Sequence, residues 1–143
     1  MKATLRLKLQ MDETTTALLQ ATMLQYTACF NAVCRYGWES HDHNGVSLHR
    51  ATYNSLCHLH PEMPSQLVIS ARMKAAEALK AGQTRIYQGK KASCPHSDLQ
   101  SIRYDARSHW VRLSEGKASL ATICGRVTVS YSVPECYQSY LSW

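Results

Sequence analysis

No apolar run in this 143-residue chain approaches the roughly 20 residues that a membrane-spanning helix needs. The first ten residues alternate between apolar and polar or charged side chains, and they lack the continuous apolar stretch of a signal peptide. We therefore expect a cytoplasmic protein with no membrane partner.

Cysteine pairs with the spacing Cys-x-x-Cys are also missing, although the chain contains six cysteines and seven histidines. Without a secretion signal, a disulfide framework is not expected, and we interpret most of the cysteines as small buried apolar residues. His41 with His43, Cys57 with His58 and His60, and Cys94 with His96 form clusters, but none of them has the two-pair spacing of a tetrahedral zinc site. The sequence predicts no metal ligand and no cofactor in this chain.

Signatures of catalysis are sparse. The chain has ten acidic residues, and apart from Asp12-Glu13 they are scattered singly, whereas a two-metal nuclease needs several converging carboxylates. A glycine-rich phosphate loop and a nucleophile elbow are both absent, and nothing locates a Cys-His pair for nucleophilic chemistry. We expect no autonomous active site in these residues.

What the chain does have is positive charge. Sixteen lysines and arginines give a formal net charge of +6, with a sequence pI of about 9.1. A basic balance of this size favours a polyanionic partner, with nucleic acid the first candidate and a membrane surface the second. An ordinary basic protein without such a partner remains the alternative. The length and the 45% hydrophobic content suit one domain, or a sheet with a small helical lobe.

Strand patterns concentrate between residues 100 and 134. Residues 101–107 and 126–133 alternate between apolar and polar side chains, which is typical of half-buried strands. Gly116 and Gly125 supply the conformational freedom that hairpin turns need. We predict an antiparallel meander with an arginine-bearing outer face.

The beginning of the chain alternates in the same way over residues 2–9. A single amphipathic strand is not stable alone in water, so we expect it to pair with the later sheet. The residues between are then an insertion of helices between strands of one sheet.

Three helices are predicted in this insertion. The first is capped by Asp12 and ends before Gly37, the second is capped by Ser47, and the third begins near Pro64 and ends at Gly82. The predicted division is residues 1–10 as first strand, 11–82 as helical lobe, 83–100 as basic linker and 101–143 as meander.

Basic residues of the third helix, the linker and the meander are the candidates for nucleic-acid contact, because cations track phosphates. The nine residues are Arg72, Lys74, Lys80, Arg85, Lys90, Lys91, Arg103, Arg107 and Arg126. Aromatic rings among them could stack on bases. Tyr104 is better explained as a core residue, because it shares a face with Ile102, whereas Trp110 shares its parity with the charged Arg112.

Four places in the chain resemble the N-terminal part of a known family. They are Ala3 to Leu7 running into Asp12-Glu13; Tyr26, Cys29, Asn31 and Ala32; Pro64 to Leu67 followed by the alanine-rich stretch Ala71 to Ala81; and Ser101 to Arg107 with Ala118 to Thr122 and Gly125 to Val129. The family is TnpB, the transposon-encoded RNA-guided nucleases, with its type V CRISPR effector relatives. The Ile-Arg-Tyr-Asp-Ala-Arg and Gly-Arg-Val stretches are the most specific of these likenesses.

The resemblance implies a wedge domain, which is a β-barrel interrupted by a helical recognition lobe. It also implies contacts with guide RNA and target DNA. Members of the family continue with a RuvC nuclease domain, which holds the catalytic carboxylates and would be the place for Mg²⁺. Nothing in these 143 residues matches that domain, so this chain would be a fragment, a standalone remnant, or one part of a split effector with a second RuvC-containing polypeptide.

We therefore predict an α+β fold, in which the first strand and the C-terminal meander form an antiparallel wedge-type β-barrel portion around an inserted helical recognition lobe. The predicted function is a non-catalytic module that binds guide RNA and target DNA within a TnpB-like or type V RNA-guided DNA endonuclease. The alternative is a protein-interaction subunit that completes its sheet with a second chain.

Overall fold

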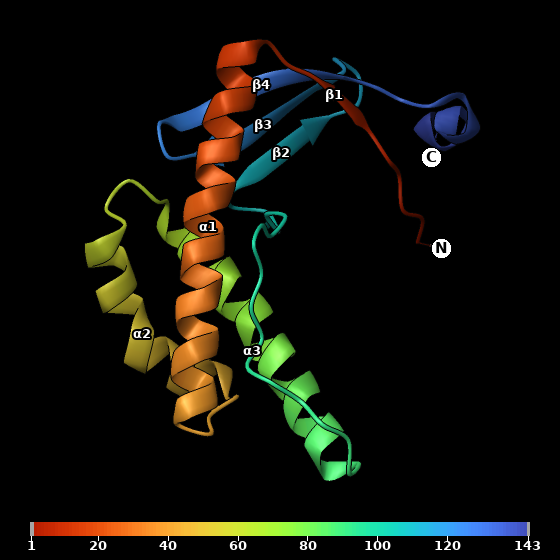
Figure 1. Ribbon diagram of the computed structural model, residues 1–143. Coiled ribbons are helices and arrows are strands. Elements are labelled where there is room, and N and C mark those ends of the chain that lie inside the picture. The colour runs from red at the N-terminus through yellow and green to blue at the C-terminus, as the bar shows by residue number, and fades with distance from the viewer. Residues whose placement is uncertain (1, 143) are drawn as a thin grey trace.

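A computed structural model describes residues 2–142 and shows an α+β fold, with a helical lobe next to an antiparallel sheet (Figure 1). In chain order the elements are β1 (Lys8–Gln10), α1 (Glu13–Glu39), α2 (Gly45–Leu59), α3 (Ser65–Tyr87), β2 (His109–Arg112), β3 (Lys117–Thr122), β4 (Gly125–Ser132) and a 3-10 helix, η1 (Glu135–Ser142). The prediction of helices inserted between strands of one sheet is confirmed.

The strand order in the sheet is β1-β4-β3-β2, and every neighbouring pair is antiparallel. The first strand pairs with the last, with Leu9 opposite Tyr131, as the sequence predicts. The sheet is open in the described residues, with β1 and β2 at its two edges, so the expected barrel is not seen. Closure into a barrel would require the two edge strands to pair with each other or with further strands.

Alternation in β4 agrees with the prediction. Val129 and Tyr131 are buried, whereas Arg126, Thr128 and Ser130 are exposed. The two hairpin turns contain the predicted glycines, whose φ angles are positive (63° at residue 116 and 85° at residue 125). These positions favour glycine because a side chain is strained there.

Residues 101–107 are not a strand, which corrects the sequence prediction. The alternation is present, because Ile102 and Tyr104 are half-buried and pack against the helical core. The backbone, however, bonds to helix side chains: the Arg103 carbonyl accepts from the Ser70 hydroxyl, and the Gln100 amide donates to Thr27 Oγ1 at 2.8 Å. Alternating apolar and polar residues predict an extended segment with one buried face, but they do not show whether that segment lies against a strand or against a helix.

Helix α1 begins as predicted and ends later. Asp12 Oδ1 accepts from the Thr15 amide at 2.7 Å, which caps the helix. Gly37, the predicted stop, lies inside the helix and is buried. The chain turns instead at His41, which has a φ of 53°. Glycine at position 37 serves close packing, because an added Cβ would lie 2.3 Å from Cδ1 of Leu79.

The other two helices also differ at their ends. Asn44, rather than Ser47, caps α2, since its Oδ1 accepts from the amides of residues 46 and 47. Helix α3 starts after Pro64 as predicted but continues past Gly82 to Tyr87. Gly82 faces the ring of Trp38, so here too glycine allows close contact between two helices.

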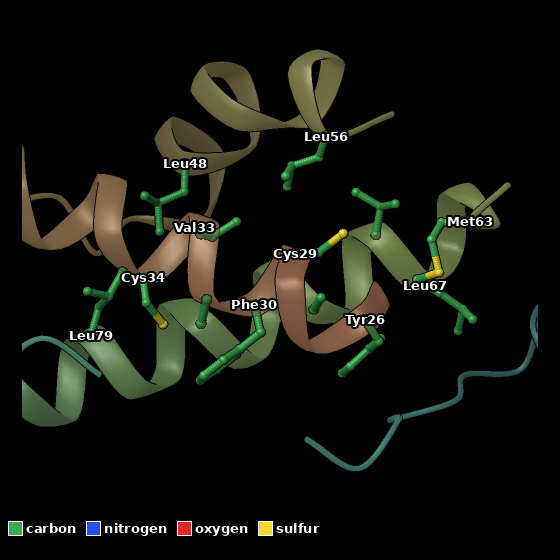
Figure 2. Close-up of a cluster of buried hydrophobic side chains, with 13 residues drawn as sticks. Tyr26, Cys29, Phe30, Val33, Cys34, Leu48, Leu56, Met63, Leu67 and Leu79 are labelled. Atoms are coloured by element: carbon green, nitrogen blue, oxygen red, sulfur yellow. The ribbon is translucent and has the colours of Figure 1, made fainter. Parts of the chain in front are cut away.

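Helix α1 joins two hydrophobic cores. Tyr26, Cys29 and Val33, all fully buried, pack against side chains of α2 and α3 (Figure 2). Its first half reaches the sheet, where Leu19 packs on the second core beside Val129. A helix of 27 residues is roughly 40 Å long, which is enough to contact both the helical core and the core at the sheet.

We call residues 88–108 the return segment, because they lead from the end of α3 back to the sheet (Figure 1). The predicted linker, residues 83–100, lies partly on α3 and partly here. The segment is anchored on α1, where Asn31 donates to the Ser97 carbonyl at 2.8 Å and accepts from the Ser97 amide at 2.9 Å. The Asn31 side chain thus satisfies the backbone N–H and C=O of Ser97, which a neighbouring strand would satisfy in a sheet.

Tyr104 connects the return segment to both cores and gives a pH-dependent prediction. Burial raises the pKa of Tyr104 to about 12, and its hydroxyl donates to the Ala121 carbonyl at 2.9 Å. The folded state holds this proton more tightly than the unfolded state, whose tyrosines titrate near about pH 10. The contribution of Tyr104 is therefore complete below about pH 10 and declines as the pH rises toward 12.

We expect urea unfolding to show that the stability difference between wild type and Tyr104→Phe shrinks between about pH 10 and pH 12. The subtraction removes the contribution of Tyr26, whose pKa is also raised by burial. A constant difference over this range would contradict the buried, neutral phenol.

Candidate nucleic-acid interface

The nine predicted basic residues divide into two groups. Lys74 and Arg103 line none of the three hollows described below, and both bond to other parts of the protein. The other seven lie at three hollows or next to them on the exposed surface: Arg72, Lys80, Arg85, Lys90, Lys91, Arg107 and Arg126.

Arg103 holds the return segment to α3. Its two terminal nitrogens donate to the two carboxylate oxygens of Glu77 at 2.8 and 2.9 Å. This bidentate bond lowers the pKa of Glu77 and raises that of Arg103. The carboxylate offsets the charge of this guanidinium and occupies two of its donors, so the main role of Arg103 here is structural.

Lys74 has a similar internal role. Its Nζ donates to the Ser101 carbonyl at 2.8 Å and lies 5.8 Å from the centre of the Tyr26 ring. Partial burial lowers its pKa, and the nearby Arg103 adds to this effect. The prediction of Lys74 as a nucleic-acid contact is not supported by this position.

Arg72 lies at the first hollow, between α2 and α3. Asn44, Gly45, His49 and Arg50 line the same hollow. Burial lowers the pKa of Arg72, and its Nε is buried with no hydrogen-bond partner in the described residues. Arg50 was not among the sequence candidates, because only the packing of α2 on α3 brings it beside Arg72.

The second hollow lies where α3 meets the return segment. Arg85 and Lys91 both line it, together with small residues such as Gly82 and Ala92. Lys80 and Lys90 are exposed on the same two segments. Tyr87, next to them at the end of α3, is 83% exposed, so its ring is free to stack.

The third hollow, which we call the junction hollow, lies between the helical lobe and the sheet. Arg107 and Arg126 line it from the return segment and from β4, opposite Pro64, Ser65 and Gln66 of α3. Arg126 donates through Nη2 to the Arg107 carbonyl and through Nη1 to Ser119 Oγ at 3.4 Å. Sequence patterns predicted both arginines but not their meeting with the start of α3.

The aromatic candidates lie where the sequence places them. Tyr104 is a core residue, as expected. Trp110 is half-buried, and the guanidinium carbon of Arg112 lies 4.3 Å from the centre of its ring. This cation–π contact occupies one face of the indole.

Groups that could carry chemistry are few in the described part of the chain. Residues 2–142 contain no cluster of three or more His, Cys, Asp or Glu side chains that could hold a metal ion. Cys29 and Cys34 are buried, and burial raises their pKa values to about 11 and about 12. Such thiols stay protonated at neutral pH and are poor nucleophiles. Cys124 and Cys136, by contrast, are exposed.

Membrane insertion through a helix has no support either. None of the described helices combines the length and the apolar character that a bilayer span requires.

Comparison of the chain with protein-family models, curated proteins and solved structures finds no match.

Proposed function

We propose that this chain is a non-catalytic nucleic-acid-binding module, which binds structured RNA and the DNA paired with it. The observation that carries the proposal is that two basic residues line each of three hollows. Arg50 meets Arg72, Arg85 meets Lys91, and Arg107 meets Arg126.

The composition of the hollows supports this function. No aspartate or glutamate lines any of the three, although the chain contains ten acidic residues. Cations in hollows that no carboxylate lines are available for phosphates, and the release of counterions from a polynucleotide favours such contacts. Exposed Tyr87 adds a ring for an unpaired base.

The finer proposal is that the module corresponds to the wedge and recognition lobe of a TnpB-like or type V RNA-guided DNA endonuclease, acting in the cytoplasm. Its support is the sequence resemblance together with the helical insertion between β1 and β2. A barrel would then need strands beyond the four described here. Cleavage, and the Mg²⁺ that it needs, would belong to a separate RuvC domain or polypeptide.

The test is a salt series with purified protein and a panel of structured RNA, single-stranded DNA and duplex DNA. We expect sub-micromolar RNA binding at about 0.1 M salt, with the logarithm of the affinity falling linearly as the logarithm of salt rises. RNA sequencing after co-purification from native cells then tests the finer proposal, which expects one discrete structured RNA. No binding to any of the three nucleic acids at about 0.1 M salt contradicts the proposed function.

A second candidate is a protein-interaction subunit, and the open sheet favours it. The outer edge of β2 has no strand beside it in the described residues, and Val111 and Leu113 next to that edge are exposed. Such an edge can accept a further strand. Mass spectrometry of the same co-purified sample separates the two, because this candidate expects a stoichiometric polypeptide without RNA.

A further inference from the structure

The junction hollow differs from the other two because one of its two arginines is held by hydrogen bonds to the protein. It has a volume of about 270 Å³ and is lined by residues of α3, the return segment, β3 and β4. Residues 64–66, 107–108 and 121–126 thus converge on one place, where the helical lobe meets the sheet.

The guanidinium of Arg126 is fixed before any ligand arrives. It is held by the Arg107 carbonyl and by Ser119 Oγ. An arginine has five N–H donors, so several remain for a ligand. The Arg107 side chain, by contrast, is exposed and has no hydrogen-bond or ion-pair partner among the described residues. One fixed and one adjustable guanidinium suit an anion with several oxygens.

The acidic residue nearest in sequence is already engaged. Asp105 Oδ1 accepts from the amides of Arg107 and Ser108 at 2.9 and 3.0 Å, and also from the Ser108 hydroxyl. Its carboxylate therefore shapes the turn that carries Arg107 and does not line the hollow, although it attracts the Arg107 guanidinium electrostatically.

The start of α3 completes the hollow. Pro64 caps the helix without a side-chain hydrogen bond, and its carbonyl accepts from the amides of Leu67 and Val68. The amides of Ser65 and Gln66 have no partner in the described residues. Free amides and the positive end of the helix dipole add to the attraction that the two arginines exert on an anion.

We propose that the junction hollow binds one phosphate group of a nucleic-acid strand between Arg107, Arg126 and the first amides of α3. The proposal rests on the nucleic-acid-binding function above and assigns one anchoring point within it. A bound phosphate would fix the strand against the joint between the two lobes, because its ligands come from both.

The site is tested by nuclear magnetic resonance of the whole chain, titrated with inorganic phosphate and then with three oligonucleotides. The oligonucleotides are one RNA with a 5′-phosphate, the same RNA with a 5′-hydroxyl, and an RNA with a 3′-phosphate. We expect the backbone amide signals of Ser65 and Gln66 to shift with phosphate and with RNA. A larger shift with a terminal phosphate identifies a monoester as the ligand, and equal shifts identify an internal diester.

Variants connect the shifts to the arginines. Arg107→Gln leaves the fold intact, because this side chain bonds to nothing in the described protein, and it should weaken phosphate binding about tenfold. Arg126→Gln should do the same, and Arg126→Lys, which keeps the charge, should retain more affinity. The matched control is Arg112→Gln, which removes an exposed arginine of the same sheet outside the hollow and should leave the phosphate affinity unchanged.

The outcomes separate this site from the wider function. RNA binding without shifts at Ser65 and Gln66 overturns the site and leaves the proposed function standing. Phosphate binding that Arg107→Gln weakens, without any RNA binding, supports the phosphate site and removes the nucleic-acid function. The site is overturned if neither phosphate nor RNA shifts the Ser65 and Gln66 signals. It is also overturned if Arg112→Gln weakens phosphate binding as much as Arg107→Gln does.

Discussion

Replacing Gly37 by alanine is expected to lower the free energy of unfolding by about 3 kcal/mol and the melting temperature by roughly 10 °C. The added Cβ would lie 2.3 Å from Leu79 Cδ1 and 2.6 Å from the Asp42 carbonyl oxygen. Leu79 can change its rotamer, but the Asp42 backbone is fixed, because its amide donates to the Gly37 carbonyl at 2.9 Å. Either α1 and α3 separate or the turn after α1 is rebuilt.

The direction of this effect is opposite to that of intrinsic helix propensity. Alanine is better than glycine in a helix interior by about 1 kcal/mol, so a glycine without a packing role would gain stability on substitution. Gly82→Ala is the matched control, since its Cβ would meet only the edge of the Trp38 ring at 3.2 Å. We expect that variant to be within about 1 kcal/mol of wild type by urea unfolding. Equal stability of Gly37→Ala and wild type would refute the tight helix crossing.

Neutralising Lys80, Arg85 and Lys91 together, each to glutamine, is expected to weaken RNA binding roughly a hundredfold at about 0.1 M salt. Each phosphate contact contributes about 0.7 to the slope of log affinity against log salt for a single strand, so three lost contacts flatten the slope by about 2. Arg85 and Lys91 line one hollow, and Lys80 lies nearby on α3. Fluorescence anisotropy over a salt series measures both quantities.

The control removes the same charge elsewhere. Lys2, Arg6 and Lys8 are exposed near the first strand and lie outside the three hollows. Changing these three to glutamine should alter the affinity less than about fivefold, because distant charges are screened within about 10 Å at 0.1 M salt. If both triple variants weaken binding equally, only net charge matters, and the hollow at the end of α3 has no specific role.

The structure also changes what the meander arginines are expected to do. From sequence, Arg103, Arg107 and Arg126 form one exposed set on a sheet face. In the structure, Arg103 is bonded to Glu77, whereas Arg107 and Arg126 share the junction hollow. Arg103→Ala should therefore reduce mainly stability, and the other two should account for the loss of binding. The alternation of residues 101–107 could not reveal this difference between the arginines, because it does not show which residues each arginine contacts in the folded protein.

Local signals in the sequence determined the three helices, the two hairpin turns and the order of the elements. The side-chain cap at Asp12, the positive φ glycines of the two hairpins and the alternation in β4 act over a few residues, so they can be read without the fold. The pairing of the first strand with the last followed from the fact that a lone amphipathic strand needs a partner.

Tertiary packing decided the ends of helices and the uses of charges. Gly37 and Gly82 look like helix stops in sequence, and only the neighbouring Leu79 and Trp38 show that they are points of close contact. The open sheet, the Arg103–Glu77 pair and the meeting of Arg107 with Arg126 all depend on residues distant in the chain. The physical reason is the same in each case: a hydrogen bond, an ion pair or a packed surface needs a partner, and one sequence window does not contain it.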